Sequence, residues 1–500
     1  MDVLQNLLYG FSIALTPMNL LFCAVGCLIG TLVGVLPGFG PIAALSLLLP
    51  LTYGLDVTGA LIMLAGIFYG AQYGGSTTSI LVNIPGETSA VMTCLDGHQM
   101  AKQGRAGAAL GIAAFGSLIA GTAAVIGLMF LAPTLAEAAL AFGPSEYASL
   151  MLMSLSLVIF LSRGSLIKGI MTAFLGLILG TVGLDRLTGE LRFVYGTVVL
   201  RDGLGIVPVM IGLFGVAEVL SNVGTVEKQM VIKTKLRNLL PTLQDWRDSA
   251  FPIIRGTLLG FFMGILPGVG TSIPTFVCYG MEKKLSKHPE RFGTGTIEGV
   301  AGPESCNNST AMANFIPMLS LGIPTTATMA MLLGALILHG IQPGPLLIVN
   351  RPDLFWGLVA SMYVGNIILV IMNLPLIPLW VQVLRIRYEY LFPMILLFCL
   401  VGSYSINNLR EEVLIMVIFG GIGYLFKYFD YEAPPLILAF VLGPMIEERG
   451  RQALALAQGN IAEVVTRPIT AVFLMITAVI LAWGLKGSLF VSKVKEQQEE

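Results

Sequence analysis

One motif occurs twice in this chain, and it constrains the fold more than any other feature. Residues 26–40 read GCLIGTLVGVLPGFG, and residues 256–270 read GTLLGFFMGILPGVG. Each copy is an apolar helical pattern with a glycine at every fourth residue, and Leu-Pro-Gly-x-Gly interrupts it. A duplicated, interrupted helix in a hydrophobic chain is typical of a secondary transporter whose binding site lies near the middle of the bilayer.

Composition identifies the solvent of this chain as lipid. Of its 500 residues, 55% are hydrophobic and only 11% are charged, whereas about 25% are charged in a typical soluble protein. The sequence therefore predicts an all-α polytopic membrane protein. Its N-terminus, Met1-Asp2, lacks the basic region of a signal peptide, so we expect the first span to remain as an anchor.

The apolar runs predict about 12 transmembrane helices plus re-entrant or discontinuous helices, because a span needs about 20 apolar residues. Residues 58–73 and 107–131 are two of these expected spans. Four segments look too short or too polar to cross and are interpreted as half-helices: 41–55, 76–92, 271–281 and 308–323. Residues 1–500 are expected to form a single transporter domain, with repeat 1 at 18–221, a cytoplasmic basic linker at 222–250, repeat 2 at 251–446, and a C-terminal helix and tail at 447–500.

Loop charges indicate how the repeats are oriented. The loops at 97–105 and 281–291 carry Lys and Arg and are expected to be cytoplasmic by the positive-inside rule. Their counterparts in the other repeat, about 336–344 and 51–61, carry neither residue. We therefore predict two inverted-topology repeats. Arg186, Arg192 and Arg201 fall on the outside in this scheme and count against it.

Each copy is followed by a polar segment around an Ile-Pro pair. Residues 72–90 read QYGGSTTSILVNIPGETSA, and residues 302–328 read GPESCNNSTAMANFIPMLSLGIPTTAT. Proline in a helix frees a backbone carbonyl, and glycine lets a ligand approach the backbone. Carbonyl, hydroxyl and amide oxygens suit Na⁺, whereas free N–H groups at a half-helix start attract carboxylates. The predicted substrate-binding residues are Pro37, Gly38, Gly40, Ser76, Thr77, Thr78, Asn83, Gly268, Gly270, Thr271, Asn307, Asn308, Ser309, Thr325 and Thr326.

Glu87 and Glu304 are the acidic residues of these segments, and an ionised carboxylate inside a membrane is usually functional. We predict that they handle the coupling cation together with Pro85 and Pro324. Simpler explanations stay open: the glycines can be a helix-packing stripe, the hydroxyls can bond their own backbone, and both glutamates can lie at an aqueous mouth.

Other chemistry-bearing residues suggest no further site. Six Cys without a C-x-x-C motif and three widely separated His predict neither disulfides nor a metal centre beyond the proposed Na⁺ site. Arg255 and the aromatic residues near predicted span ends are interpreted as interfacial anchors. These aromatic residues are Tyr9, Trp246, Trp356, Trp380 and Trp483.

With these motifs, residues 20–445 resemble the large membrane subunit of bacterial tripartite tricarboxylate transporters, the TctA family. The segments that carry the resemblance are 34–50, 69–87, 264–276, 302–336 and 340–345. The resemblance implies a multi-pass protein of the bacterial inner membrane that takes up a small di- or tricarboxylate, such as citrate or tartrate. It also implies coupling to an ion gradient, Na⁺ or H⁺, and two partners: a small membrane subunit and a periplasmic solute-binding protein.

Two other functions remain as alternatives. A passive anion channel could also use duplicated broken helices. An integral-membrane lipid-modifying enzyme would need paired Asp or His, and the sequence offers only isolated acidic residues, so we expect no enzyme. No cofactor and no nucleic-acid partner are expected.

Overall fold

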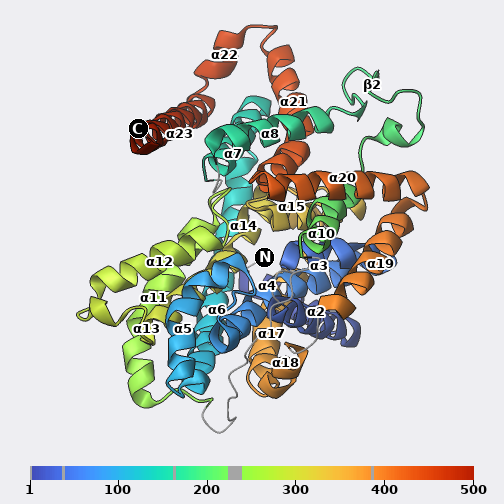
Figure 1. Ribbon diagram of the computed structural model, residues 1–500. Coiled ribbons are helices and arrows are strands. Elements are labelled where there is room, and N and C mark those ends of the chain that lie inside the picture. Colours follow the sequence, from blue (N-terminus) through green and yellow to red (C-terminus); the bar gives the residue numbers. More distant parts are fainter. Residues whose placement is uncertain (1–2, 37–39, 162–164, 223–238, 385–387, 500) are drawn as a thin grey trace.

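The chain is almost entirely helical in the computed structural model, which describes residues 3–36, 40–161, 165–222, 239–384 and 388–499 (Figure 1). The first half contains α1 (Val3–Ala14), α2 (Pro17–Val35), α3 (Pro41–Leu48), α4 (Val57–Val82), α5 (Val91–Lys102), α6 (Ala106–Ala139), α7 (Pro144–Leu161), α8 (Leu166–Gly180), α9 (Ile206–Met210) and α10 (Ala217–Asn222). A π-helical segment, Ile211–Val216, joins α9 to α10, and two short strands, β1 (Gly183–Leu184) and β2 (Leu191–Arg192), form an antiparallel hairpin after α8.

The second half is also helical. It contains α11 (Leu243–Gly264), α12 (Ser272–Leu285), α13 (Glu298–Ala313), α14 (Phe315–Leu321), α15 (Ala327–Leu338), α16 (Leu347–Asn350), α17 (Pro352–Asn373), α18 (Ile377–Val383), α19 (Tyr388–Asn407), α20 (Arg410–Tyr428), α21 (Pro434–Leu456), α22 (Ile461–Thr466) and α23 (Pro468–Glu499). Single helical turns lie at Leu49–Thr52, Thr88–Ala90, Val199–Asp202 and Pro289–Arg291.

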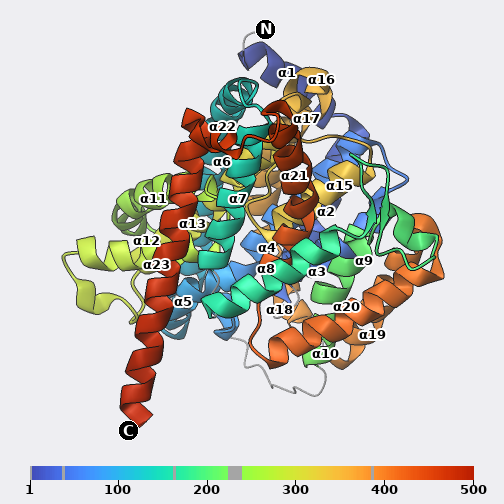
Figure 2. The same cartoon turned by 90° about the horizontal axis from the view of Figure 1, so that it is seen from above.

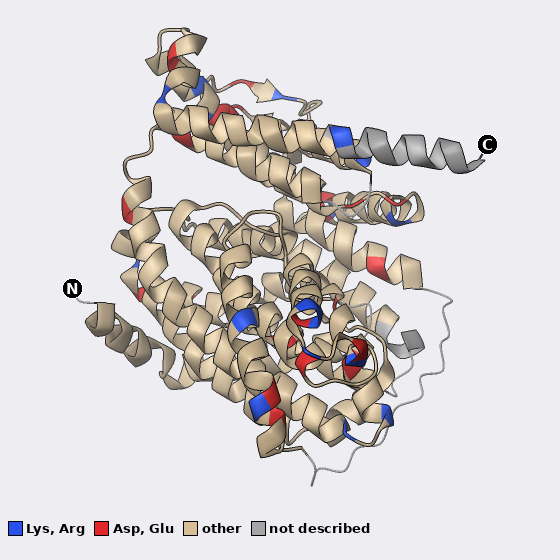
Figure 3. Ribbon diagram, turned by 90° about the vertical axis from the view of Figure 1, so that its left-hand side faces the viewer, with Lys and Arg blue, Asp and Glu red and all other residues tan. Residues whose placement is uncertain are grey.

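Among the described residues, five helices are long and apolar enough to cross a membrane: α2, α4, α6, α7 and α17. Several shorter apolar helices accompany them, α8 and α15 among them, so a multi-pass helical membrane protein is supported while the number of about 12 spans stays a prediction. Figure 3 agrees with this, since long stretches of helix carry no charged residue.

Two sequence-based boundaries were wrong. The segments 58–73 and 76–92 were expected to be a span and a half-helix, yet α4 runs unbroken through Val57–Val82, with 25 of its 26 residues buried. The polar residues Ser76, Thr78 and Ser79 continue the helix because their hydroxyls donate to groups inside the protein. In addition, α11 begins at Leu243, inside the range expected for the linker, with a capping box between Thr242 and Asp245. The linker residues 223–238 lie outside the described part of the chain.

Glycine stripes bring two pairs of helices into backbone contact. A Cβ atom built on Gly26, Gly30 or Gly34 of α2 would lie 2.2–2.4 Å from a carbonyl oxygen of Met63, Ile67 or Ala71 in α4. In the second half, Cβ atoms on Gly256, Gly260 and Gly264 of α11 would lie 2.3–2.7 Å from carbonyl oxygens of Gly302, Cys306 and Thr310 in α13. Residue numbers rise together along both partners, so both pairs are parallel. The packing interpretation of these glycines therefore holds.

We call residues 17–90 unit 1 and residues 243–326 unit 2, because their contacts follow one register. Each contact residue in α4 has its counterpart 239 positions later in α13, as Met63 and Gly302 show. The same offset relates Asn83 to Gly322, and both adopt the left-handed conformation, with φ of 63° and 72°, directly before an Ile-Pro pair. The two units are therefore built alike locally, whereas their opposite orientation in the membrane stays a prediction.

Figures 1 and 2 place α4 near the centre of the molecule, α11–α13 on one side and α19 and α20 on the other. The long helix α23 lies at the periphery (Figure 2). The region of the predicted cytoplasmic loop at 97–105 contacts the segment that follows the predicted loop at 281–291. Gln103 donates to the Thr294 carbonyl at 2.7 Å, and the Asp96 carboxylate accepts from the N–H groups of Gly293 and Gly295.

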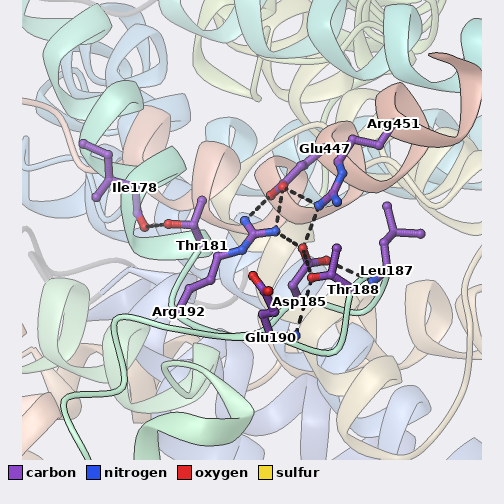
Figure 4. A network of polar contacts seen from close by, with 9 residues as sticks. All are labelled: Ile178, Thr181, Asp185, Leu187, Thr188, Glu190, Arg192, Glu447 and Arg451. Atoms are coloured by element: carbon purple, nitrogen blue, oxygen red, sulfur yellow. Dashed lines mark hydrogen bonds and ion pairs between the residues drawn. The ribbon is translucent and has the colours of Figure 1, made fainter. Parts of the chain in front are cut away.

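A charged cluster joins the hairpin after α8 to the end of α21 (Figure 4). Arg192 donates to Glu447 at 2.9 and 3.0 Å and to Asp185, and Arg451 donates to Asp185 at 2.7 Å. Hydrogen bonds from Arg451 and Arg192 hold the pKa of Asp185 well below its usual range.

Three residues interpreted as interfacial anchors have other roles. Trp356 and Trp380 are 2% and 0% exposed. The indole N–H of Trp380 donates to the Met372 carbonyl at 3.1 Å. Arg255 donates to both carboxylate oxygens of Glu282, at 2.8 and 2.5 Å. The two tryptophans therefore pack inside the protein, whereas Arg255, whose side chain is 35% exposed, holds α11 against α12.

Candidate functional site

The chain breaks of the two units meet at one cavity of about 580 Å³. Gly40, which follows the break after α2, lines this cavity together with Gly268 and Gly270, which follow α11. Val158 and Phe214 extend the wall from helices outside both units. Segments 230 residues apart thus form one concave surface.

Local sequence explains why the chain turns at this point. Gly40 and Gly270 have φ of 37° and 64°, a region that residues with a Cβ atom rarely adopt. Gly268 also has a positive φ, and a Cβ atom there would lie 2.7 Å from the backbone of Val158. The Gly268 N–H donates to the Thr325 carbonyl at 2.7 Å. Each break therefore needs glycine, and the second break is tied to the Ile-Pro segment of its own unit.

Five helices begin at the wall of this cavity. They are α3, α5, α12, α15 and α21, and residues from the first turn of each line the cavity: Pro41, Val91, Ser272, Ala327 and Pro434. Helix N-termini carry partial positive charge and free N–H groups. Five of them around one cavity form an environment that attracts anions without any basic side chain.

The charged side chains of the cavity wall are all acidic among the described residues. They are Glu87, Glu218 and Glu432. Lys427 forms an ion pair with Glu218 from outside the wall. An ionised Glu87 beside helix N-termini suits a site that takes an anion and a cation together, because it repels a lone anion and the helix starts repel a lone cation.

Three buried side chains of the wall hold polar atoms without a hydrogen-bond partner. They are Glu87, with Oε1 unpaired, Asn314, with both side-chain polar atoms unpaired, and Thr325, with Oγ1 unpaired. Asn314 and Thr325 are 1% and 0% exposed. Unpaired buried polar groups are costly in proteins, so these atoms mark positions at which a ligand or water restores the missing bonds.

A hydrogen bond links the two units across the cavity wall. The hydroxyls of Thr88 and Ser272 lie 2.6 Å apart. Both residues line the cavity, and each lies near a helix start. Movement of one unit against the other would therefore change the shape of this wall.

The predicted site residues separate into three groups. Eight line the large cavity: Gly40, Pro85, Glu87, Gly268, Gly270, Thr271, Thr325 and Thr326. Nine do not line it: Ser76, Thr77, Thr78, Asn83, Glu304, Asn307, Asn308, Ser309 and Pro324. Pro37 and Gly38 lie outside the described residues. Whether any of them binds substrate or ion stays a prediction.

Several residues of the second group connect helices. Thr78 donates to the Val35 carbonyl at 2.8 Å, and Ser309 donates to the Thr257 carbonyl at 2.7 Å, so each fastens the second helix of its unit to the first. Asn83 is exposed and ends α4 in the left-handed conformation.

Glu304 lies buried beside α4 and α5 instead of at an aqueous mouth. It is 1% exposed, and it accepts hydrogen bonds from Ser76 at 2.5 Å and from Thr93. Glu87 is also buried, at 9% exposure, although it lines the cavity. The expectation that both glutamates could lie in open water therefore fails for Glu304.

Sequence reasoning did not name several wall residues: Gln72, Glu218, Ser272, Asn314 and Glu432. Gln72 accepts from Ser89 at 3.0 Å and so braces the loop that carries Glu87. Gln72 and Asn314 lie inside the two polar segments, and an amide among apolar residues was a usable signal. Glu218 and Glu432 lie next to helix ends far from the motifs, and no pattern in the surrounding residues distinguishes them.

Comparison with known proteins gives a consistent result. The sequence model of the Tripartite tricarboxylate transporter TctA family matches residues 20–438. A protein of Agrobacterium vitis, described as an uncharacterized 52.8 kDa protein in the TAR-I ttuC' 3' region, is 48% identical over 500 residues and is covered in full, as is this chain. A second protein of that organism, from the TAR-II ttuC' 3' region, is 48% identical over 230 residues, which cover 46% of this chain and 95% of the relative. No solved structure matches the chain.

Proposed function

Because this chain belongs to the tripartite tricarboxylate transporter TctA family, we propose that it is the permease subunit that carries a small di- or tricarboxylate across the bacterial inner membrane. Membership in a tripartite family implies partner subunits, and we propose a small membrane subunit and a periplasmic solute-binding protein. Uptake is coupled to an ion gradient, with Na⁺ as the first candidate.

The observation that carries this proposal is the convergence of five helix N-termini on one cavity that also holds the carboxyl group of Glu87. The helix starts attract a substrate carboxylate through backbone N–H groups. An ionised Glu87 would repel that anion, and the repulsion is relieved when a cation enters with it. The cavity therefore favours a carboxylate with a cation over a carboxylate alone.

Residue roles follow from position. Thr326, just before α15, binds the substrate together with Thr271, just before α12, whereas Glu87 and the buried side-chain oxygens of Asn314 and Thr325 serve the coupling cation. Thr326 also caps α15, since its hydroxyl accepts from the Met329 N–H at 3.0 Å. Pro85 and Pro324 set the direction of the two segments that carry these groups.

We propose alternating access as the mechanism. The two units form inverted repeats whose breaks meet at the cavity, so that exchange of their conformations opens the cavity to one side and then to the other. The α2–α4 and α11–α13 pairs share the same register of helix contacts, which supports this proposal.

Uptake into proteoliposomes tests the function. The purified protein is reconstituted with its partner subunits and supplied with labelled citrate, tartrate and related acids, with and without an inward Na⁺ gradient. We expect saturable uptake of at least one acid that accelerates with the gradient, and a large loss in Thr325→Val. The matched control is Thr134→Val, because Thr134 is exposed and bonds only its own helix, at the Phe130 carbonyl. Flux that neither saturates nor responds to a gradient would instead identify a channel.

A further inference from the structure

A second cavity lies apart from the first and shares no lining residue with it. It measures about 10 Å³, and its polar wall consists of Tyr73, Ser76 and Thr77 from α4, Ser117 from α6 and Asn373 from α17. A space of this size holds one water molecule or one small ion. It is too small for a carboxylate, so it is not an extension of the substrate site.

Hydrogen-bond accounting shows that this wall presents mainly oxygen acceptors. The Ser76 hydroxyl donates to Glu304, and the side-chain N–H of Asn373 donates to the Leu369 carbonyl at 2.9 Å. Asn373 Oδ1 and the Tyr73 hydroxyl are buried without a partner. Ser117 accepts from Asn308 at 2.6 Å, and its second lone pair stays free. Oxygen ligands of this type are those that hard cations prefer.

The nearby charge distinguishes a cation from a water molecule. Glu304 lies behind Ser76, which lines the cavity and donates to it at 2.5 Å. Two hydroxyls, from Ser76 and Thr93, bond this carboxylate, and none of the ion pairs found among the described residues involves Glu304. A buried carboxyl group either holds its proton or lies near a compensating positive charge. A cation in the cavity would supply that charge to an ionised Glu304, whereas a water molecule would not.

We propose that this cavity binds one small monovalent cation, with Tyr73, Ser76, Ser117 and Asn373 as oxygen ligands and Glu304 as the balancing charge one hydroxyl away. The site ties α4, α6 and α17 together next to α13. The inference extends the proposed ion coupling. A role of this cation in uptake rests on the proposed function, whereas the binding of the cation does not.

Binding of Na⁺ to the purified full-length protein, without substrate, tests the site. Radioactive Na⁺ binding and the melting temperature are measured at constant ionic strength, with choline replacing Na⁺ and with K⁺ and Li⁺ as further arms. We expect saturable Na⁺ binding that raises the melting temperature. In Asn373→Leu, Tyr73→Phe and Glu304→Gln we expect Na⁺ affinity to fall at least about tenfold, since each removes a ligand or the balancing charge.

Controls keep the outcome interpretable. Ser117→Ala is the mildest ligand change and is compared with Thr134→Val on the same helix, which leaves Na⁺ affinity unchanged. A variant counts only if its melting temperature in choline shows that it is folded. The inference is overturned if the wild-type protein binds no Na⁺ in preference to choline, or if affinity is unchanged in the folded ligand variants. If Na⁺ binds but no carboxylate is taken up, the proposed function fails while the cation site stands.

Discussion

Units 1 and 2 share a backbone plan but differ in where they place acidic residues. In the polar segment of unit 1 (72–90) the acidic residue is Glu87, after the Ile-Pro pair and at the large cavity, and the equivalent position in unit 2 is Thr326. In the polar segment of unit 2 (302–328) the acidic residue is Glu304, in α13, and its equivalent in unit 1 is Ala65. Duplication thus conserved the positions at which helices touch and break, whereas the chemistry diverged.

This difference separates two requirements. Close helix packing demands glycine at fixed positions, so it keeps both copies alike. Binding of an ion or a substrate needs each charge only once. When one unit supplies a carboxylate, the equivalent residue of the other unit can therefore be of another type. The comparison can be tested by changing equivalent residues in both units and asking whether the effects match.

The largest effect is expected at the two glycine seams, where the glycines of α2 contact the backbone of α4 and those of α11 contact the backbone of α13. Gly30→Ala and Gly260→Ala each place a Cβ atom 2.3–2.4 Å from a backbone carbonyl oxygen, so the parallel helices must separate. Overpacking of this kind costs about 1–3 kcal/mol or more, and the measurement is the yield of monodisperse protein in detergent and its melting temperature. Gly421→Ala is the control, since nothing lies within 4 Å of its added atom. A loss in one unit only would show that the seams are not equivalent.

A smaller effect, confined to activity, is expected at the Ile-Pro segments. Glu87→Gln removes the ionisable carboxyl group of Glu87 from the cavity wall, and we expect the initial rate of uptake to fall at least about tenfold, a change of about 1.4 kcal/mol in the activation free energy. Initial rates in proteoliposomes are compared with those of Glu190→Gln, an exposed glutamate beside β2. Wild-type rates in Glu87→Gln would remove this carboxylate from the mechanism.

The left-handed positions provide a third comparison. Gly322→Ala places a side chain at φ 72° and 2.9 Å from the Pro343 carbonyl oxygen, so we expect a loss of about 1–2 kcal/mol. Asn83→Gly keeps an allowed conformation at φ 63°, and we expect stability to change by less than about 0.5 kcal/mol. Thermal unfolding measures both, and equal losses would contradict the assigned conformations.

The smallest effect is expected where charges, not glycines, hold helices together. The pKa of Asp185 is lowered in the folded protein, so its stabilising contribution is present above the unfolded value of about 3.9 and is lost as pH falls below it. At neutral pH, trypsin should therefore cleave the Asp185→Asn variant several-fold faster than the wild type, at the exposed Arg186 and Arg201.

The melting temperature adds a pH test of the same cluster. The difference between wild type and Asp185→Asn should be constant from about pH 5 to 8 and shrink below about pH 4. A difference that grows on acidification would show that the ion pairs have been assigned the wrong role.

Much of this architecture was predictable because backbone requirements leave a sequence signature. The Leu-Pro-Gly-x-Gly breaks, the glycine stripes and the half-helix at 41–55 follow from the conformational limits of proline and glycine, and the structure has α3 at Pro41–Leu48. The family was recognisable from the same motifs.

Polar residues were harder to interpret. Thr78 and Ser309 were predicted to bind substrate, yet each donates to a carbonyl of the neighbouring helix, at 2.8 and 2.7 Å. Polarity alone does not distinguish a side chain that faces a cavity from one that bonds another helix, since both satisfy the same need for partners in lipid. Trp380 was misplaced for the same reason, because an indole N–H finds its partner equally well at a membrane surface or in a core.

The seam between α2 and α4, like that between α11 and α13, has no side chain at its closest points. Two arrangements of a packed interface usually differ in their side-chain rotamers. The glycines at these contacts have no side-chain rotamers that could change. We infer that each helix pair shifts only as one rigid body. The flexing that a transport cycle demands then concentrates at the few backbone pivots beside each pair: Gly40, Asn83, Gly270 and Gly322.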